Sequence, residues 1–338
     1  MKQYLQTLFD SAVEEGVFPG CVASVYYQGK WTKIVSGKKA MIPQEEMNSE
    51  DTLYDLASLS KVVSTTMIVL KLIEEGKMLL SDDILQYLPD CPFENMDILS
   101  LLTHTSGLPP IIEVDRNDTK ESIYNKICHI KRQHTGEVVY SDVGYILLQF
   151  VLEALMKKSL DEIAKNYVFK PLGMLKTMYC PNDELKELCA PTEISPFLHR
   201  LLRGEVHDEK AYQLGGVAGH AGVFSCIEDM EKYATMMLND TFLSWPIKKL
   251  CYQPALKHMT IPRGIGFLTS DKKIGSYLSA TVAYHTGFCG NSILLDYDKQ
   301  IAIIVLSNRV HPTRNNEKIL EWRKTMHDAI YCYLEESK

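Results

Sequence analysis

The chain has 338 residues, which is long enough to bury a large hydrophobic core in one or two domains. With 46% hydrophobic and 23% charged residues, the composition is that of a globular protein and excludes a disordered or fibrous chain. The net charge of −7 provides no basic surface, so we expect no nucleic-acid partner. Nine scattered cysteines without a C-x-x-C pair are typical of reduced thiols.

The N-terminal residues contain no apolar run ahead of a small-residue cleavage site, so no secretory signal is predicted. The most apolar segment, residues 143–156, is interrupted by Gln149 and Glu153 and is too short to span a bilayer. These features predict a cytoplasmic protein without a membrane span.

The predicted elements begin with a helix over residues 3–15, where apolar side chains recur at helical spacing. Two β-rich runs follow, residues 21–27 and 31–35, and the short turn between them predicts a hairpin. A second helix is predicted from about residue 58 to residue 75. The chain up to about residue 250 is then mostly helical, with its clearest helix near residues 141–158.

Short β-branched runs return after about residue 255. They predict strands at 265–268, 283–288, 292–296 and 301–307, followed by a closing helix at 317–335. Strands at both ends of a helical middle predict an α+β fold with one antiparallel sheet. We expect residues 1–57 and 255–338 to form the sheet domain and residues 58–254 a mostly helical domain. The active site would lie in the cleft between them.

A serine three residues before a lysine places both side chains on one face of a helix. Chance predicts about two such pairs in this composition. The chain has three: Ser36 with Lys39, Ser58 with Lys61, and Ser270 with Lys273. Only Ser58 opens a predicted helix, where the backbone field is positive and the serine N–H can face an oxyanion. Lys61 can take the hydroxyl proton if burial or a cation lowers its pKa. Alternatively, Ser58 caps the helix and Lys61 lies on the surface.

Two further triplets favour catalysis. Tyr140, Ser141 and Asp142 precede the clearest helix, and a tyrosine there can point into a cleft. The segment 285–287 (HTG) lies in an apolar strand, where glycine permits close approach of a ligand or another backbone. Each triplet is common, but the order S-x-x-K, Y-S-D, H-T-G across both expected domains is specific.

With these three motifs the chain resembles the superfamily of class C β-lactamases, penicillin-binding DD-peptidases and family VIII esterases. The resemblance covers nearly the whole chain and includes four further segments: 18–20 (FPG), 101–109 (LLTHTSGLP), 171–174 (PLGM) and 219–225 (GHAGVFS). We expect His104, in the second of these segments, to order backbone rather than to act in catalysis.

The resemblance implies a β-lactamase-like (DD-peptidase) fold, with its sheet flanked by terminal helices, and an acyl-enzyme on Ser58. Lys61 would be the base or an electrostatic support, and Tyr140 would shuttle the proton to the leaving group and later activate water. The oxyanion hole would consist of the backbone N–H groups of Ser58 and Phe288. Four residues would line the substrate site: Asp142, His285, Thr286 and Gly287. No cofactor is implied.

Two residues depart from the β-lactamase pattern, in which lysine is usual at position 285 and asparagine at position 142. Because His285 is only partly charged near neutrality, we expect poor β-lactam hydrolysis. Arg309, at the end of a strand, could instead grip a substrate carboxylate with two hydrogen bonds. Equally, Arg309 could be an exposed residue that caps the edge of the sheet.

Segments 206–211, 214–220 and 307–312 resemble a subgroup linked to cell-wall turnover, the penicillin-binding-protein-4B-like proteins and muropeptide amidases. Imidazole and carboxylate groups commonly bind zinc, which makes candidate ligands of His207, Asp208 and His220. Their spacing, however, matches no compact metal motif. We therefore expect them to order a loop or contact substrate, in an enzyme without metal.

The resulting prediction is a serine hydrolase that cleaves an amide or ester bond in a small-molecule or peptide substrate, with peptidoglycan-derived peptides favoured. A carboxylesterase is the first alternative and a weak β-lactamase the second. From a different class, the chain could be a non-catalytic penicillin-binding or sensor protein, although the intact motifs argue against this. The sequence leaves the oligomeric state open.

Overall fold

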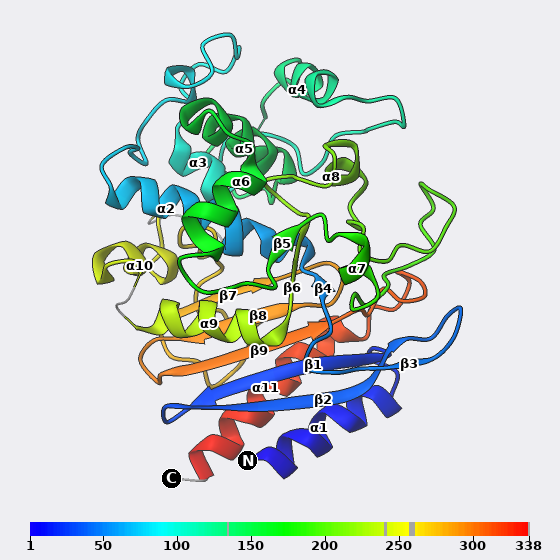
Figure 1. Ribbon diagram of the computed structural model, residues 1–338. Helices are drawn as coiled ribbons and strands as arrows, with labels where there is room; N and C mark the ends of the chain where they lie inside the picture. The colour runs from blue at the N-terminus through cyan, green and yellow to red at the C-terminus, as the bar shows by residue number, and fades with distance from the viewer. Residues whose placement is uncertain (134, 240–241, 257–260, 337–338) are drawn as a thin grey trace.

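The computed structural model of the protein describes residues 1–133, 135–239, 242–256 and 261–336. Its central element is a six-stranded antiparallel sheet whose strands come from both ends of the chain, in the order β3-β2-β1-β9-β8-β7 (Figure 1). The strands are β1 (Gly20–Tyr27), β2 (Lys30–Ala40), β3 (Glu46–Met47), β7 (Val282–Thr286), β8 (Ser292–Asp296) and β9 (Ile301–Ser307). Because β1 pairs with β9, the two ends of the chain are joined at the centre of the sheet.

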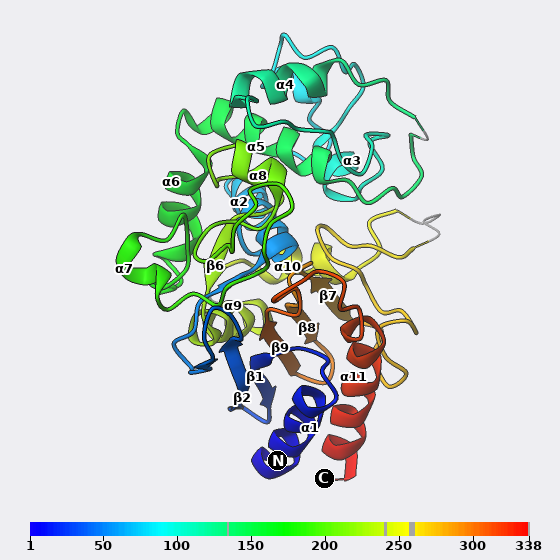
Figure 2. The ribbon, with the colours of Figure 1, turned by 90° about the vertical axis from the view of Figure 1, so that its right-hand side faces the viewer.

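Helices cover both faces of this sheet (Figure 2). On one face, α1 (Lys2–Glu14) and α11 (Ile319–Glu336) pack on alternate residues of β1, such as Cys21 and Ala23. The intervening Val22 faces the opposite side, where it joins the larger core formed with the other helices. This period-2 alternation is what a strand buried on both faces requires.

The other helices lie between β4 and β7 along the chain. They are α2 (Thr66–Glu74), α3 (Ile98–Leu102), α4 (Lys120–Cys128), α5 (Asp142–Met156), α6 (Leu160–Ala164), α7 (Asp183–Lys186), α8 (Glu209–Gln213), α9 (Ile227–Leu238) and α10 (Trp245–Tyr252). Shorter helical turns are η1 (Ala57–Leu59), η2 (Lys61–Thr65), η3 (Ile84–Gln86) and η4 (Lys165–Phe169). A small sheet of order β4-β6-β5 is made of Tyr54–Asp55, Val223–Ser225 and Met178–Tyr179. Among the described helices, none is both long and apolar enough to cross a bilayer.

The predicted terminal helices, the N-terminal hairpin and the strands at 292–296 and 301–307 are confirmed. The strand predicted at 265–268 was wrong. The chain turns back there, and the N–H of Gly264 donates to the carbonyl of Phe267 at 3.0 Å. Only single bridges remain at this place, joining Leu268 to Arg263 and to Tyr284. The α+β fold is confirmed, whereas the division into two domains stays a prediction.

Candidate active site

Ser58 lies in an irregular turn rather than at the start of a regular helix. The 3₁₀ turn η1 leads into one turn of π-helix, η2, before α2 begins. Ala57 has a φ of 47°, in the left-handed region that alanine adopts only under strain. Asp55 supports this conformation, because its Oδ1 accepts the Ala57 N–H at 2.8 Å. The backbone therefore fixes the partly exposed Ser58, as is common at functional sites.

Lys61 is fully buried and lies directly beside Ser58. Its Nζ is 3.0 Å from Ser58 Oγ, 2.8 Å from Asp142 Oδ1 and 3.2 Å from the His220 carbonyl oxygen. Burial lowers the pKa of Lys61, but the charge of Asp142 and the nearby Tyr140 outweigh burial, so the net pKa is raised. The sequence suggested a lysine with a lowered pKa, whereas the contacts favour a protonated one.

The N-terminus of α5 positions the second motif. Ser141 caps the helix, since its Oγ accepts the Gly144 N–H at 3.1 Å. The Ser141 N–H donates to Nδ1 of the buried His104 at 3.0 Å, so His104 orders backbone as expected. Asp142 then falls in the first turn of α5, where the helix dipole favours a carboxylate. Tyr140 is left on the loop before the cap.

Tyr140 lies between two cations and is 37% exposed. Its ring centre is 4.9 Å from Lys61 Nζ and 5.6 Å from the guanidinium carbon of Arg263. The ring also packs on the His104 ring at 4.5 Å. Burial and the charges of Arg263 and Lys61 hold the pKa of His104 well below its usual range. The imidazole is therefore a neutral support for the tyrosine.

The end of β7 packs against the backbone that leads to Ser58. A Cβ on Gly287 would lie 2.3 Å from the carbonyl oxygen of Leu56, so only glycine fits there. Asn291 reinforces the contact, because its Nδ2 donates to the carbonyl of Asp55 at 2.7 Å. The third motif and the serine turn are thus brought together, although the chain separates them by most of its length.

His285 is buried on β7, and its Nδ1 lies 2.9 Å from the carbonyl oxygen of Thr286. Burial, then the charges of Lys61 and Arg263, hold the pKa of His285 well below its usual range. His285 is therefore neutral near pH 7 and offers a substrate no fixed positive charge.

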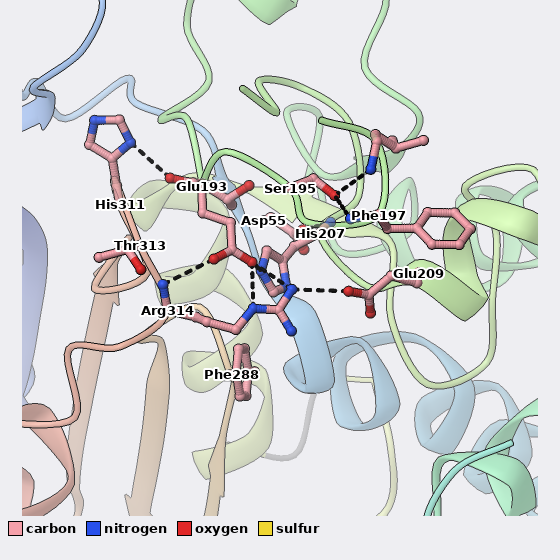
Figure 3. Close-up of polar contacts among 12 residues, drawn as sticks. Asp55, Glu193, Ser195, Phe197, His207, Glu209, Phe288, His311, Thr313 and Arg314 are labelled. Atoms are coloured by element: carbon pink, nitrogen blue, oxygen red, sulfur yellow. Dashed lines mark hydrogen bonds and ion pairs between the residues drawn. The ribbon is translucent and has the colours of Figure 1, made fainter. Parts of the chain in front are cut away.

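Phe288 follows the third motif, and a polar cluster surrounds its half-exposed ring (Figure 3). The ring stacks on His207 with centres 5.4 Å apart and planes 24° apart. The guanidinium carbons of Arg309 and Arg314 lie 4.6 Å and 5.9 Å from its centre. These contacts fix the loop whose backbone N–H we expected in the oxyanion hole.

Glu193 ties this cluster together and was not singled out from the sequence. Its Oε1 lies 2.7 Å from His207 Nε2 and accepts from Arg314 Nε at 2.6 Å. Burial raises the pKa of Glu193, but the opposite effect of His207 and Arg314 is larger, so the net pKa is lowered to about 2. Arg314 also pairs with Glu209 at 2.9 Å (Figure 3). His207 therefore orders the loop.

Arg309 is buried, unlike the exposed edge residue that the sequence allowed. Its Nε donates to the Phe288 carbonyl at 3.0 Å, and its Nη1 donates to the carbonyls of Arg314 and Asn316 at 3.0 Å and 2.6 Å. With these donors used on backbone, Arg309 is a scaffold for the Phe288 loop. That Arg309 binds a substrate carboxylate stays a prediction, and these contacts do not support it.

Arg263, like Glu193, is a residue of the site that the sequence analysis missed. Its side chain is buried against Tyr140, and its Nε has no hydrogen-bond partner. Within the described residues, no carboxylate forms an ion pair with it. The only sequence signal is an arginine between apolar and glycine residues, which does not reveal that the turn at Gly264–Phe267 brings it beside Tyr140.

A serine that follows the strained Ala57 lies beside a buried lysine, and a tyrosine lies against the same ammonium group. This arrangement is the one expected of a serine hydrolase on a β-lactamase-like fold. A family model described as Beta-lactamase matches residues 5–324, and the chain belongs to this family. A protein of Salmonella gallinarum (strain 287/91 / NCTC 13346) named "Putative D-alanyl-D-alanine carboxypeptidase" is 29% identical over 317 residues. The match covers 80% of this chain and 72% of that protein.

Two solved structures share the fold. "EstCE1, a hydrolase with promiscuous acyltransferase activity" has a TM-score of 0.77 at 18% identity, covering 95% of this chain and 97% of its own. The class C β-lactamase from Rhodobacter sphaeroides has a TM-score of 0.74 at 16% identity, covering 98% and 99%. The protein is therefore a serine hydrolase of the β-lactamase family.

Proposed function

We propose that this chain cleaves an amide or ester bond of peptidoglycan-derived peptides through an acyl-enzyme on Ser58. The observation that carries the proposal is the 3.0 Å contact between Lys61 Nζ and Ser58 Oγ, with Tyr140 against the same ammonium group. No other Ser-x-x-Lys pair in the described residues has this contact. Neither Ser36 nor Ser270 adjoins a tyrosine and a buried lysine in this way.

These positions support the following chemistry. Ser58 Oγ attacks the carbonyl carbon, its proton moves to Tyr140 Oη, and the Tyr140 phenolic proton moves to the leaving nitrogen or oxygen. The bond to the leaving group then breaks. Water hydrolyses the ester by the reverse proton transfers and restores Ser58. We assign the oxyanion hole to the N–H groups of Ser58 and Phe288.

Arg263 supports a substrate that carries a carboxylate near the scissile bond. A buried guanidinium without an anionic partner is costly, and a bidentate carboxylate would satisfy it. Neutral His285 cannot take this role, and Arg309 is held by backbone carbonyls. Thr286 and Gly287 would form the wall along which the peptide lies. The name of the Salmonella relative points to the same chemistry, a peptide ending in a free carboxylate.

Intact mass and peptide mapping test the acyl-enzyme. A fluorophosphonate or penicillin probe is expected to add one label, on Ser58, and Ser58→Ala is expected to abolish it. Ser270→Ala, which alters another Ser-x-x-Lys pair, is the matched control and keeps the label. Labelling that persists in Ser58→Ala would refute the proposal.

Substrate class is tested by turnover of muramyl peptides and D-alanyl-D-alanine peptides, a short-chain nitrophenyl ester and nitrocefin. We expect the peptides to have the highest kcat/KM and nitrocefin the lowest. Preference for the ester would favour a carboxylesterase, and rapid nitrocefin turnover would favour a β-lactamase.

A further inference from the structure

A second layer of charge lies behind Lys61, and the proposed mechanism does not use it. Asp208 Oδ1 is 2.8 Å from Nε2 of the buried His220, and Asp208 Oδ2 is 2.9 Å from Nζ of Lys210. A carboxylate oxygen of Asp142, a carboxylate oxygen of Asp208 and a ring nitrogen of His220 all lie within 4.8 Å of one another. The network therefore contains the carboxylates of Asp142 and Asp208, the ammonium groups of Lys61 and Lys210, and His220. Lys61 connects it to Ser58.

Lys61 has acceptors for three protons: Ser58 Oγ, Asp142 Oδ1 and the His220 carbonyl. An ammonium group donates three hydrogen bonds, whereas a neutral amine donates two. Loss of the Lys61 proton would also leave the Asp142 carboxylate without a cation, beside the second carboxylate of Asp208. Removing one member of a buried pair is strongly destabilising.

We propose that Asp142, backed by the Asp208–His220–Lys210 cluster, is a positioning residue that keeps Lys61 an ammonium ion throughout the reaction. This rests on the proposed acyl-enzyme on Ser58. Lys61 then supports the charge that develops on Ser58 Oγ, and Tyr140 alone relays the proton. No proton is gained or lost by Lys61 in either half-reaction, so the transfers written above stay balanced.

Outside this network and Tyr140, the groups on other elements that lie near Lys61 are cationic or neutral, so they do not help to hold its proton. Arg263 is cationic and lies 5.6 Å from the centre of the Tyr140 ring. The pKa of both His104 and His285 is lowered, so these imidazoles are neutral. The Tyr145 ring centre lies 5.7 Å from Lys61 Nζ.

The counter-charge in this network comes from the two carboxylates. Burial raises the pKa of both Asp142 and Asp208, but the opposite effect of their neighbours is larger, so the net pKa of each carboxyl group is lowered. The two carboxylates are therefore the anions that hold the Lys61 proton.

The test is the pH dependence of the rate at which a fluorophosphonate phosphonylates Ser58, with loss of fluoride, from neutral to alkaline pH. Asp142→Asn keeps an oxygen acceptor for Lys61 but removes the charge, so the pKa of Lys61 falls. We expect the alkaline limb of the profile to move down by at least about one pH unit. Asp208→Asn, which retains an N-cap for α8, is expected to move it the same way by less. Asp229→Asn, which changes a buried carboxylate of α9 that pairs with the partly exposed Lys232, is the control and leaves the profile unchanged.

The outcomes are separable. A faster reaction near neutral pH in Asp142→Asn would show that neutral Lys61 is the base, and would overturn the proposal. Profiles that superimpose, with only a uniform loss of rate, would give Asp142 a merely structural role and would also overturn it. A wild type whose Ser58 is not labelled by the fluorophosphonate at all would instead refute the proposed function.

Discussion

The two sides of the active site handle charge differently. On the helix side, the cation of Lys61 is paired within the protein, because Asp142 lies 2.8 Å away. On the strand side, the guanidinium of Arg263 has no carboxylate partner among the described residues, and His285 is neutral. A charge that is satisfied internally supports the chemistry in every step, whereas one left unsatisfied is available to a ligand. In the proposed function, the helix side thus serves the reaction and the strand side serves recognition.

Tyr140 contacts both sides, so we expect removal of its hydroxyl to have the largest effect on activity. Tyr140→Phe keeps the ring against His104 and both cations but removes the proton relay. We expect kcat/KM to fall by about 10²–10⁴-fold without a matching loss of thermal stability. Ser141→Ala, which removes the adjacent helix cap, is expected to cost about 1 kcal/mol of stability and much less activity. Equal and mild losses of activity in the two variants would mean that Tyr140 is structural.

Arg263→Gln tests the strand side. It keeps a polar side chain, although a shorter one, and removes the charge. For the best peptide substrate we expect a fall in kcat/KM of about 10–100-fold, the range typical of a hydrogen bond to a charged group. The same peptide with an amidated C-terminus lacks the carboxylate, and its slower turnover is expected to stay within about threefold. Equal losses for acid and amide would contradict recognition of the carboxylate by Arg263.

The smallest expected effect is a difference in the acid sensitivity of the two sides. The folded-state pKa of His285 lies below its unfolded value of about 6.5, so the unfolded chain binds a proton first as the pH falls. The free energy of unfolding therefore decreases below about pH 6.5, by up to about 1.4 kcal/mol per pH unit for each such histidine. The folded-state pKa of Asp142 is also lowered, so its contribution to stability is lost only below about pH 4.

Urea unfolding between about pH 7 and about pH 5 measures this slope. His285→Gln is expected to make the slope shallower, and Asp142→Asn is expected to leave it as in the wild type. Parallel curves for His285→Gln and the wild type would show that His285 is not the neutral, buried imidazole described above.

Local physics made much of the fold predictable. Strands β8 and β9 were predicted with their observed bounds because short β-branched runs between turns have few alternatives. The prediction failed where glycine changed the geometry. Residues 265–268 have the apolar composition of a strand, but Gly266, with a φ of 80°, belongs to a tight turn. The π-helical turn η2 after Ser58 has no sequence signal either.

The sequence by itself predicted which residues carry the proposed chemistry, because Ser58, Lys61 and Tyr140 stand in ordered motifs whose residue types suit acyl transfer. Only the tertiary structure decided how their charges balance. The pairing of Lys61 with Asp142 joins residues distant in the chain, and the two residues lie close to the pair formed by Asp208 and His220. Arg263 belongs to no motif, and the role proposed for it rests on its having no carboxylate partner among the residues that the structure describes. Such electrostatic properties depend on distance and burial, and neither quantity is encoded in the spacing of residues along the chain.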